Sequence, residues 1–203
     1  MMNIHRFSQQ PNLSVWRKPR AVICLVLLCA MATAMANSRP LSEFKVTTVY
    51  LVRHAEKAAE PAADPPLTEA GKKRAEELAH KLSQAGIKTI FTSQYLRTKQ
   101  TAGPLAKLLG ITATVVPVNM VIPTKMSATN ARELSPKYLA EMVERVNSSP
   151  GDVLIAGHSN TVPELIKALG GDIIPTIDES EYGDLFVVTV YAKGKAKVAH
   201  LKQ

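Results

Sequence analysis

The chain has 203 residues, of which 46% are hydrophobic, and a formal net charge of +8. This length supports one buried core and is short for two full domains. The basic residues are scattered and aromatic residues make up only 5% of the chain, which is unlike a nucleic-acid-binding surface. We therefore expect one domain that does not bind nucleic acid and whose positive charge favours anionic ligands.

The first 36 residues differ from the rest of the chain. They hold four of the 25 Lys and Arg residues and none of the 17 acids, so residues 37–203 carry a net charge of +4. A basic segment precedes an apolar stretch, residues 21–34, and Ala34-Met35-Ala36 follows, which is the pattern of a secretory signal peptide cleaved after Ala36. The apolar stretch is shorter than the roughly 20 residues that span a membrane.

This leader predicts a periplasmic or secreted domain over residues 37–203, without stable membrane insertion after cleavage. The alternative is a domain anchored in the membrane by an uncleaved N-terminal segment. Both cysteines, Cys24 and Cys29, lie within the leader, and the bulky Leu28 disfavours lipid attachment at Cys29. The cleaved domain would therefore have no disulfide, thiol nucleophile or cysteine metal site.

Short apolar runs alternate with segments of helical periodicity through the rest of the chain. The predicted strands cover residues 46–52, 88–91, 112–118, 152–156, 185–191 and 195–201. The predicted helices cover residues 69–85, 95–109, 136–147 and 162–169. This order predicts an α/β fold: a three-layer α/β/α sandwich with a mainly parallel central sheet, right-handed crossovers and an antiparallel edge strand.

Capping and breaking residues mark the ends of these helices. Thr68 is a good N-cap for the first helix, and Gly86 is expected to end it. Within the second helix, Gly103-Pro104 is expected to cause a bend or a restart. Pro136 suits the first turn of the third helix. Residues 119–130 are polar and predicted to be irregular.

Three exit turns carry residues suited to binding and transferring a phosphoryl group. Arg53-His54 follows one strand, Gly157-His158-Ser159-Asn160 follows another, and Arg97 lies about one turn inside the helix that follows a third. Parallel strands place such turns at one edge of the sheet, and the amides of a helix start favour an anion.

The side chains in these turns have complementary abilities. Arg53 and Arg97 can bind phosphate oxygens in bidentate fashion. Of the two imidazoles, His54 and His158, one can attack phosphorus if it is neutral, and the other, preferably protonated, can stabilise the transferring oxygens. Two such arginines, two histidines and a helix start predict a phosphate pocket.

With these motifs the sequence resembles the histidine phosphatase superfamily, which has the phosphoglycerate-mutase-like fold. The resemblance rests, in chain order, on Leu51-Val52-Arg53-His54-Ala55-Glu56, Leu67-Thr68-Glu69-Ala70-Gly71, Thr92-Ser93 with Arg97 and Gln100-Thr101-Ala102, and Gly157-His158-Ser159-Asn160. It implies a small exported bacterial-type member in which His54 is the nucleophile that becomes phosphohistidine. It also implies that Arg53 and Arg97 hold the phosphoryl group and that His158 is the second pocket histidine.

The chain departs from this resemblance in its acidic residues. Larger members carry an acidic proton donor after the third strand, whereas residues 118–132 contain no Asp or Glu. Glu133 is the nearest candidate, although a solvated helix start explains it equally well. Glu56 or Asp64 could serve as the proton donor instead, and a leaving group of low basicity would need no donor.

Two further groups of residues have simpler interpretations. Glu179, Glu181 and Asp184 form an acidic loop that we interpret as ordinary surface, with an electrostatic gate as the alternative. Two histidines beside acids could suggest zinc, but the neighbouring arginines would repel a cation. We therefore expect neither a metal nor a cofactor.

The sequence thus predicts a metal-independent phosphomonoesterase that acts through a phosphohistidine on an exported or envelope phosphate ester. Its partner would be a small phosphorylated substrate. One alternative is a phosphotransfer mutase, although the segments that would enclose a mutase's substrate are not evident. Another is a phosphate-binding or regulatory module with weak turnover. The sequence specifies neither the substrate nor the oligomeric state.

Overall fold

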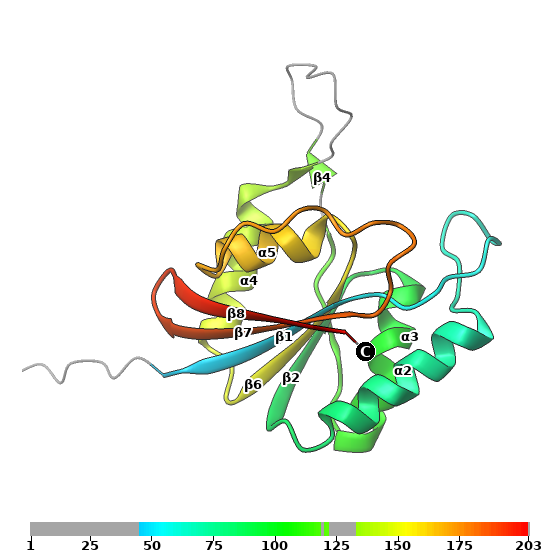
Figure 1. Ribbon diagram of the computed structural model, residues 1–203, viewed down its shortest axis with the longest axis horizontal. Helices are drawn as coiled ribbons and strands as arrows, with labels where there is room; N and C mark the ends of the chain where they lie inside the picture. Colours follow the sequence, from blue (N-terminus) through cyan, green and yellow to red (C-terminus); the bar gives the residue numbers. More distant parts are fainter. Residues whose placement is uncertain (1–44, 119, 122–132, 203) are drawn as a thin grey trace, which may run out of the picture. The chain divides into compact units, whose positions relative to one another are not determined.

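A six-stranded sheet with the strand order β3-β2-β6-β1-β7-β8 forms the centre of the fold (Figure 1). The computed structural model describes residues 45–118, 120–121 and 133–202. The strands of the sheet are β1 (Thr47–Arg53), β2 (Ile87–Thr92), β3 (Thr114–Val115), β6 (Asp152–Gly157), β7 (Asp184–Ala192) and β8 (Lys195–Lys202). The short strands β4 (Met120–Val121) and β5 (Glu133–Leu134) form a separate antiparallel pair.

The sheet is mixed, as its strand pairings show. Strand β1 is parallel to β6, and β2 is parallel to both β6 and β3. In contrast, β7 runs antiparallel to β1, and β8 runs antiparallel to β7. The predicted antiparallel edge is therefore a two-stranded hairpin. The parallel strands β1, β2 and β6 bring their carboxyl ends to one edge of the sheet, where the candidate residues lie.

Four helices cover the two faces of this sheet (Figure 1). Helices α2 (Glu69–Leu82) and α3 (Leu96–Leu109) pack on one face, and α4 (Pro136–Asn147) and α5 (Thr161–Ala168) pack on the other. Successive strand residues point to opposite faces, so Val52 contributes to the α2–α3 core, whereas Leu51 contributes to the α4–α5 core. The predicted three-layer α/β/α sandwich is confirmed.

The helix boundaries agree with the sequence at some ends and differ at others. Thr68 caps α2 by accepting a hydrogen bond from the Gly71 amide at 3.1 Å, as predicted. The helix ends at Leu82, however, and Gly86 with its φ of 71° lies in the turn that follows. The prediction of a helix reaching Gly86 was wrong because a turn of three further residues comes first.

Helix α3 is one continuous helix through Gly103-Pro104, so the expected restart was wrong. Proline removes one backbone hydrogen bond from a helix. Here Ala102 and Leu105, on either side of the proline, are fully buried in the core, and this packing favours a continuous helix. This is a case of tertiary packing overriding local propensity.

Strand β3 is much shorter than the predicted 112–118. Only Thr114 and Val115 pair with β2, because β3 lies at the edge of the sheet and has one neighbour. Further along, the Val118 amide bonds the side-chain oxygen of Gln94 at 2.9 Å instead of a strand backbone. The chain thereby leaves the sheet at Val118, beside the candidate site.

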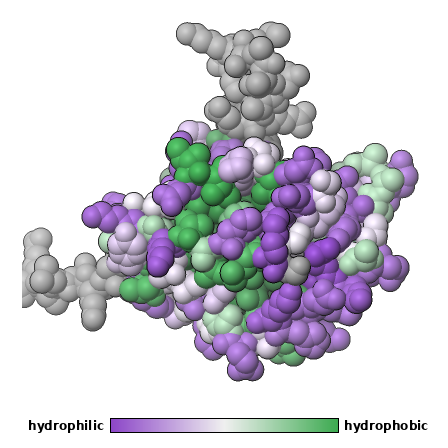
Figure 2. Space-filling model, in the orientation of Figure 1, coloured by the Kyte–Doolittle hydropathy of each residue, from purple (hydrophilic) through white to green (hydrophobic). Residues whose placement is uncertain are grey.

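Several predictions concern residues outside the described part of the chain, among them the leader, its two cysteines and most of residues 119–130. Within the described residues, no helix has the length and apolar character needed to cross a membrane. Figure 2 shows one face of the molecule, with hydrophilic side chains over α2 and hydrophobic ones gathered near α5 and the β7–β8 hairpin. Ile174, Ala196 and Val198 are partly buried hydrophobic residues that pack against this core.

Candidate active site

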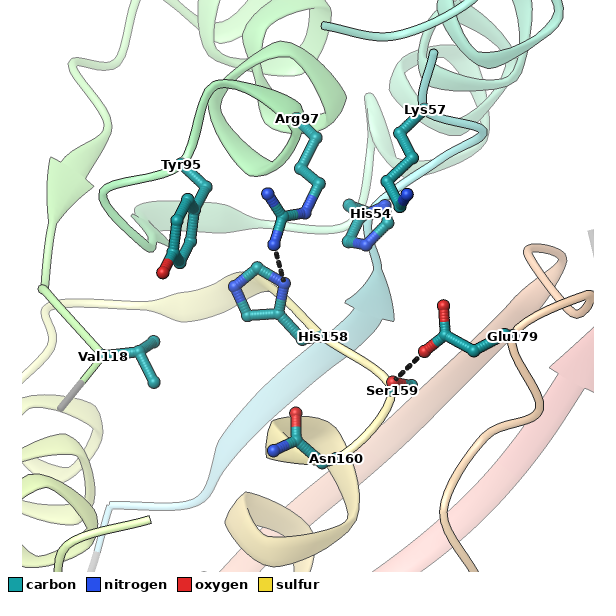
Figure 3. A pocket seen from close by; sticks show the side chains of 9 residues that line it. All are labelled: His54, Lys57, Tyr95, Arg97, Val118, His158, Ser159, Asn160 and Glu179. Atoms are coloured by element: carbon teal, nitrogen blue, oxygen red, sulfur yellow. Dashed lines mark hydrogen bonds between the residues drawn. The ribbon is translucent and has the colours of Figure 1, made fainter. Parts of the chain in front are cut away.

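A cavity of about 250 Å³ lies at the edge of the sheet where β1, β2 and β6 end. Its lining residues come from five parts of the chain and are His54, Lys57, Tyr95, Arg97, Val118, His158, Ser159, Asn160 and Glu179 (Figure 3). Three of the four residues singled out in the sequence, His54, Arg97 and His158, line the cavity directly. The fourth, Arg53, is 2% exposed and is not part of the lining.

His54 is held in one orientation at the end of β1. Its backbone amide bonds the Gly157 carbonyl at 3.0 Å, and its Nδ1 lies 2.9 Å from the Ala55 carbonyl oxygen. A carbonyl only accepts, so Nδ1 carries the hydrogen and the lone pair is on Nε2. The Ala55 peptide is held in turn, since its amide donates to Thr101 Oγ1 at 2.9 Å.

Burial lowers the pKa of His54 to about 4. The hydrogen bond to Ala55 opposes this shift, whereas the charges of Arg53 and Arg97 add to it. At neutral pH the imidazole is therefore uncharged. A neutral imidazole with a fixed Nδ1–H has the form that a nitrogen nucleophile requires.

His158 lies at the start of the turn after β6 and is 7% exposed. Its Nε2 is 3.0 Å from Ser93 Oγ, and its Nδ1 is 3.5 Å from Arg97 Nη2. A guanidinium only donates, so Nδ1 accepts and Nε2–H donates to Ser93. The ring centroids of His54 and His158 are 5.5 Å apart.

The prediction of a protonated second imidazole does not hold for the unliganded protein. Burial, with added repulsion from Arg97, His54 and Arg53, lowers the pKa of His158 to about 3. Both imidazoles are thus neutral at pH 7. The main physical reason is that burial desolvates the imidazole, and the two guanidinium groups add positive charge in the same small space.

Arg97 reaches from the first turn of α3 between Tyr95 and His54 towards His158 (Figure 3). Its guanidinium lies 4.3 Å from the Tyr95 ring centroid, and its Nη1 is 3.9 Å from Asp64 Oδ1. Burial lowers its pKa, and the buried Nε has no hydrogen-bond partner among the described residues.

The start of α3 differs from the predicted anion site. The Leu96 amide donates to Asp64 Oδ1 at 2.8 Å, so a carboxylate of the chain already uses the first amide of the helix. The positive charge available to a ligand on this side of the cavity comes from the Arg97 side chain instead.

Arg53 is surrounded by the loop of residues 178–182, which connects α5 to β7. Its Nη1 donates to the carbonyl oxygens of Asp178 and Glu181, at 2.7 and 2.9 Å, and its Nη2 donates to Glu179 Oε2 at 2.7 Å. Tyr182 stacks on the guanidinium with its ring centroid 4.3 Å away. Like that of Arg97, the buried Nε has no hydrogen-bond partner among the described residues.

The interpretation of the acidic residues as an ordinary surface loop was wrong for Glu179, which bonds Arg53 and lines the cavity, and for Asp184, which is buried at the start of β7. The sequence did contain a signal for the position of this loop. An antiparallel strand that pairs with β1 must begin at the edge where β1 ends, and Leu185 is indeed the partner of Val52. The loop that enters β7 therefore lies beside Arg53-His54.

The two arginines present equivalent groups. In each guanidinium, Nε and Nη2 point the same way and form the side-on edge that binds an oxyanion through two parallel hydrogen bonds. Both Nε atoms are buried and unpaired within the described chain, and each plane is held by a tyrosine. Buried polar groups without a partner are rare in proteins, so this donor set fits an oxyanion ligand.

The other acids considered in the sequence are engaged elsewhere or lie outside the described side chains. Glu56 accepts three hydrogen bonds from Arg74, which lowers the pKa of this carboxyl. Asp64 caps α3, and Glu133 lies in β5, with its side chain outside the description. Among the described lining residues, Glu179 is the one carboxylate. No group of three or more metal-ligating side chains occurs in the described residues.

These features define an α/β protein with an oxyanion site at the carboxyl edge of its sheet. The family model of the histidine phosphatase superfamily (branch 1) matches residues 49–118, which include β1, β2 and α3. Over these residues, which include Arg53, His54 and Arg97, the chain is similar to the histidine phosphatase superfamily.

Solved structures of similar fold include phosphatases. The protein histidine phosphatase SixA complexed with tungstate is 20% identical, with a TM-score of 0.58, over 77% of this chain and 97% of that chain. A mycobacterial glucosyl-3-phosphoglycerate phosphatase in complex with inorganic phosphate is 15% identical, with a TM-score of 0.58, over 77% and 97% of the two chains. Comparison with curated proteins gave no match.

Proposed function

We propose that the protein is a metal-independent phosphomonoesterase that forms a phosphohistidine at His54. The observation that carries this proposal is the state of His54: a neutral imidazole whose Nδ1 is fixed on the Ala55 carbonyl, in a cavity with Arg97 and His158. The arginines supply the positive charge that a transferring phosphoryl group needs, so the reaction does not require a metal for this purpose.

The proposed reaction has two displacements at phosphorus. His54 Nε2 attacks the phosphorus in line, a P–N bond forms, the P–O bond to the alcohol breaks, and the departing oxygen takes a proton from a water molecule. A water molecule then attacks the same phosphorus, the P–N bond breaks, and inorganic phosphate leaves with His54 restored. The side-on edge of Arg97 holds phosphoryl oxygens during both steps.

His158 changes its role when an anion binds. It is neutral in the unliganded protein, with Nδ1 as an acceptor facing Arg97. A phosphate dianion beside this ring favours its protonated form. His158 then donates from Nδ1 to a phosphoryl oxygen, while Ser93 keeps the ring in place through Nε2.

The size of the cavity supports a small phosphate ester as the substrate. A volume of about 250 Å³ holds a phosphoryl group and a modest alcohol. Lys57 and Asn160 also line the cavity, so the alcohol portion would meet polar groups. The phosphatase names of the structural neighbours support this reaction class without selecting a substrate.

The test is a screen of phosphate esters against the purified domain, with a chelator present, and with His54→Ala as the control. We expect hydrolysis by the wild type, loss of at least about 1,000-fold in kcat for the variant, and an unchanged circular dichroism spectrum. Rapid quenching should reveal an acid-labile phosphoenzyme in the wild type alone. Undiminished hydrolysis by His54→Ala would refute the assignment, and activity that disappears with chelator would indicate a metal site.

We further propose that the domain acts outside the cytosol, which rests on the signal-peptide pattern of residues 1–36. Expression of the full chain with export intact, followed by intact-mass measurement, tests this. The expected product begins at Asn37. A cytoplasmic product that retains residues 1–36 would contradict export.

A further inference from the structure

The side-on edge of Arg53 is covered by an acidic side chain of the protein itself. Nη2 of this edge donates to Glu179 Oε2 at 2.7 Å, while Nε of the same edge has no partner among the described residues. The outer Nη1 is used differently, because it bonds two backbone carbonyls of the 178–182 loop. The edge that suits a phosphoryl group is thus occupied by one carboxylate oxygen.

Glu179 is well placed to leave this position. Its side chain is 73% exposed, whereas that of Arg53 is 1% exposed. Its other oxygen accepts a hydrogen bond from Ser159 Oγ at 2.8 Å, across the mouth of the cavity (Figure 3). The backbone carbonyls of Asp178 and Glu181, rather than the Glu179 carboxylate, tie the loop to Arg53 Nη1. The carboxylate can therefore swing into solvent while the loop stays in place.

We propose that Glu179 is an internal competitor of the phosphoryl group. In the unliganded protein its carboxylate occupies Arg53 Nη2 and shields this arginine from the cavity. An entering phosphoryl oxygen displaces it and takes both Nη2 and Nε. This inference rests on the proposed function, since it concerns the same oxyanion site.

Glu179 lowers the affinity of the site for oxyanions, because its contact with Arg53 Nη2 must break before an oxyanion can bind there. It also favours release of inorganic phosphate, because the carboxylate returns to Arg53 when the product leaves. Repulsion between the carboxylate and a bound dianion acts in the same direction. Glu179 thereby sets how tightly the site holds phosphate without touching the reacting atoms.

The loop offers a matched control at Glu181. Its carboxylate faces Lys202 Nζ at 3.5 Å, and only its backbone carbonyl contacts Arg53. Glu181→Gln therefore removes the same charge from the same loop but leaves the contact with Arg53 intact. Glu179→Gln removes the charge at the contact itself, and its exposed position makes folding of this variant straightforward.

The experiment is isothermal titration of the wild type and both variants with inorganic phosphate and, separately, with tungstate. We expect Glu179→Gln to lower both dissociation constants about fivefold, the upper range of a partly exposed ion pair, and Glu181→Gln to change them by less than about 1.5-fold. Equal tightening in both variants would show that removing any negative charge from the loop has the same effect, and it would overturn the inference. Unchanged or weaker binding by Glu179→Gln would overturn it too.

Direct binding separates this inference from the proposed function. If the wild type binds phosphate but Glu179→Gln binds no more tightly, the inference fails and the phosphatase proposal stands. If neither protein binds either oxyanion, both fail. Binding that appears only in Glu179→Gln would support the competitor directly.

Discussion

The two arginines at the cavity are alike in their tyrosine neighbours and their Nε atoms, and they differ in the contacts of Nη1 and Nη2. Each guanidinium stacks on a tyrosine at 4.3 Å and has a buried Nε without a partner in the described chain. Arg53, however, makes three short hydrogen bonds to the 178–182 loop. Among the described residues, Nη1 and Nη2 of Arg97 have longer contacts, 3.9 Å to Asp64 and 3.5 Å to His158.

The sequence assigned both arginines the same task, holding the phosphoryl group, whereas their contacts differ. Arg53 ties the loop before β7 to the end of β1, so it supports the fold as well as any ligand. Arg97 is a desolvated cation with weak partners, which costs stability and leaves its donors for an anion. We refer below to the Arg53 half of the site (Arg53, His54 and residues 178–182) and the Arg97 half (Arg97, Tyr95 and His158).

The sharpest test of the comparison replaces each arginine by methionine, which has a similar apolar length. We expect Arg53→Met to lower the free energy of unfolding by about 3 kcal/mol, because two loop carbonyls and Glu179 lose their donor. Arg97→Met should change it by less than about 1 kcal/mol, since a poorly paired buried charge is removed. Urea unfolding followed by circular dichroism measures both.

In ligand binding, the two variants should not follow the order of their stability losses. Arg97→Met is expected to weaken tungstate binding by about 100-fold or more, because a bidentate, charge-assisted contact is lost. A larger loss of stability in Arg97→Met than in Arg53→Met would show that the two halves have been assigned the wrong way round.

Acid should destabilise the protein through its two neutral histidines, one in each half. In the unfolded chain these imidazoles take up protons near pH 6.5, whereas in the folded protein the pKa values are about 4 for His54 and about 3 for His158. Their contribution is complete above about pH 6.5 and is lost as the pH falls towards the folded values. We expect each histidine to contribute a loss on the order of 3 kcal/mol between pH 7 and pH 4.

The variant His158→Gln checks this source of the pH dependence, because it keeps a donor near Ser93 but cannot titrate. Urea unfolding at pH 7, 5 and 4 should show a shallower decline for the variant than for the wild type. Parallel declines would mean that carboxylate groups, and not the histidines, govern acid unfolding.

Two glycines in the neighbouring helices α2 and α3 provide the smallest test. A Cβ on Gly71, in the first turn of α2, would overlap the Glu56 carbonyl oxygen, two residues after His54. We expect Gly71→Ala to cost about 2 kcal/mol, because backbone must move. A Cβ on Gly103 in α3 would meet nothing within 4 Å.

Gly103→Ala is therefore the matched control and should stabilise the protein by up to about 1 kcal/mol, as expected for alanine in a helix interior. Thermal unfolding of the two variants measures the difference. A harmless Gly71→Ala would show that the turn after His54 has room to adjust and is not held by α2.

The sequence by itself determined the layered α/β architecture and the meeting of His54, Arg97 and His158 at one sheet edge. Both follow from regular patterns: alternating apolar periodicities specify the elements, and parallel strands place their exit turns together. Thr68 at the start of α2 and Pro136 at the start of α4 show that capping residues can be assigned locally as well.

Only the tertiary structure decided how these groups are partnered. The contact between Arg53 and Glu179 joins residues 126 positions apart, and Glu56 and Asp64 proved to be engaged by Arg74 and by the start of α3. The charge state of His158 likewise depends on burial and on two arginines brought near it by packing. Local patterns report which residues arrive at the edge of the sheet, whereas pairing and desolvation depend on distances that only the folded chain sets.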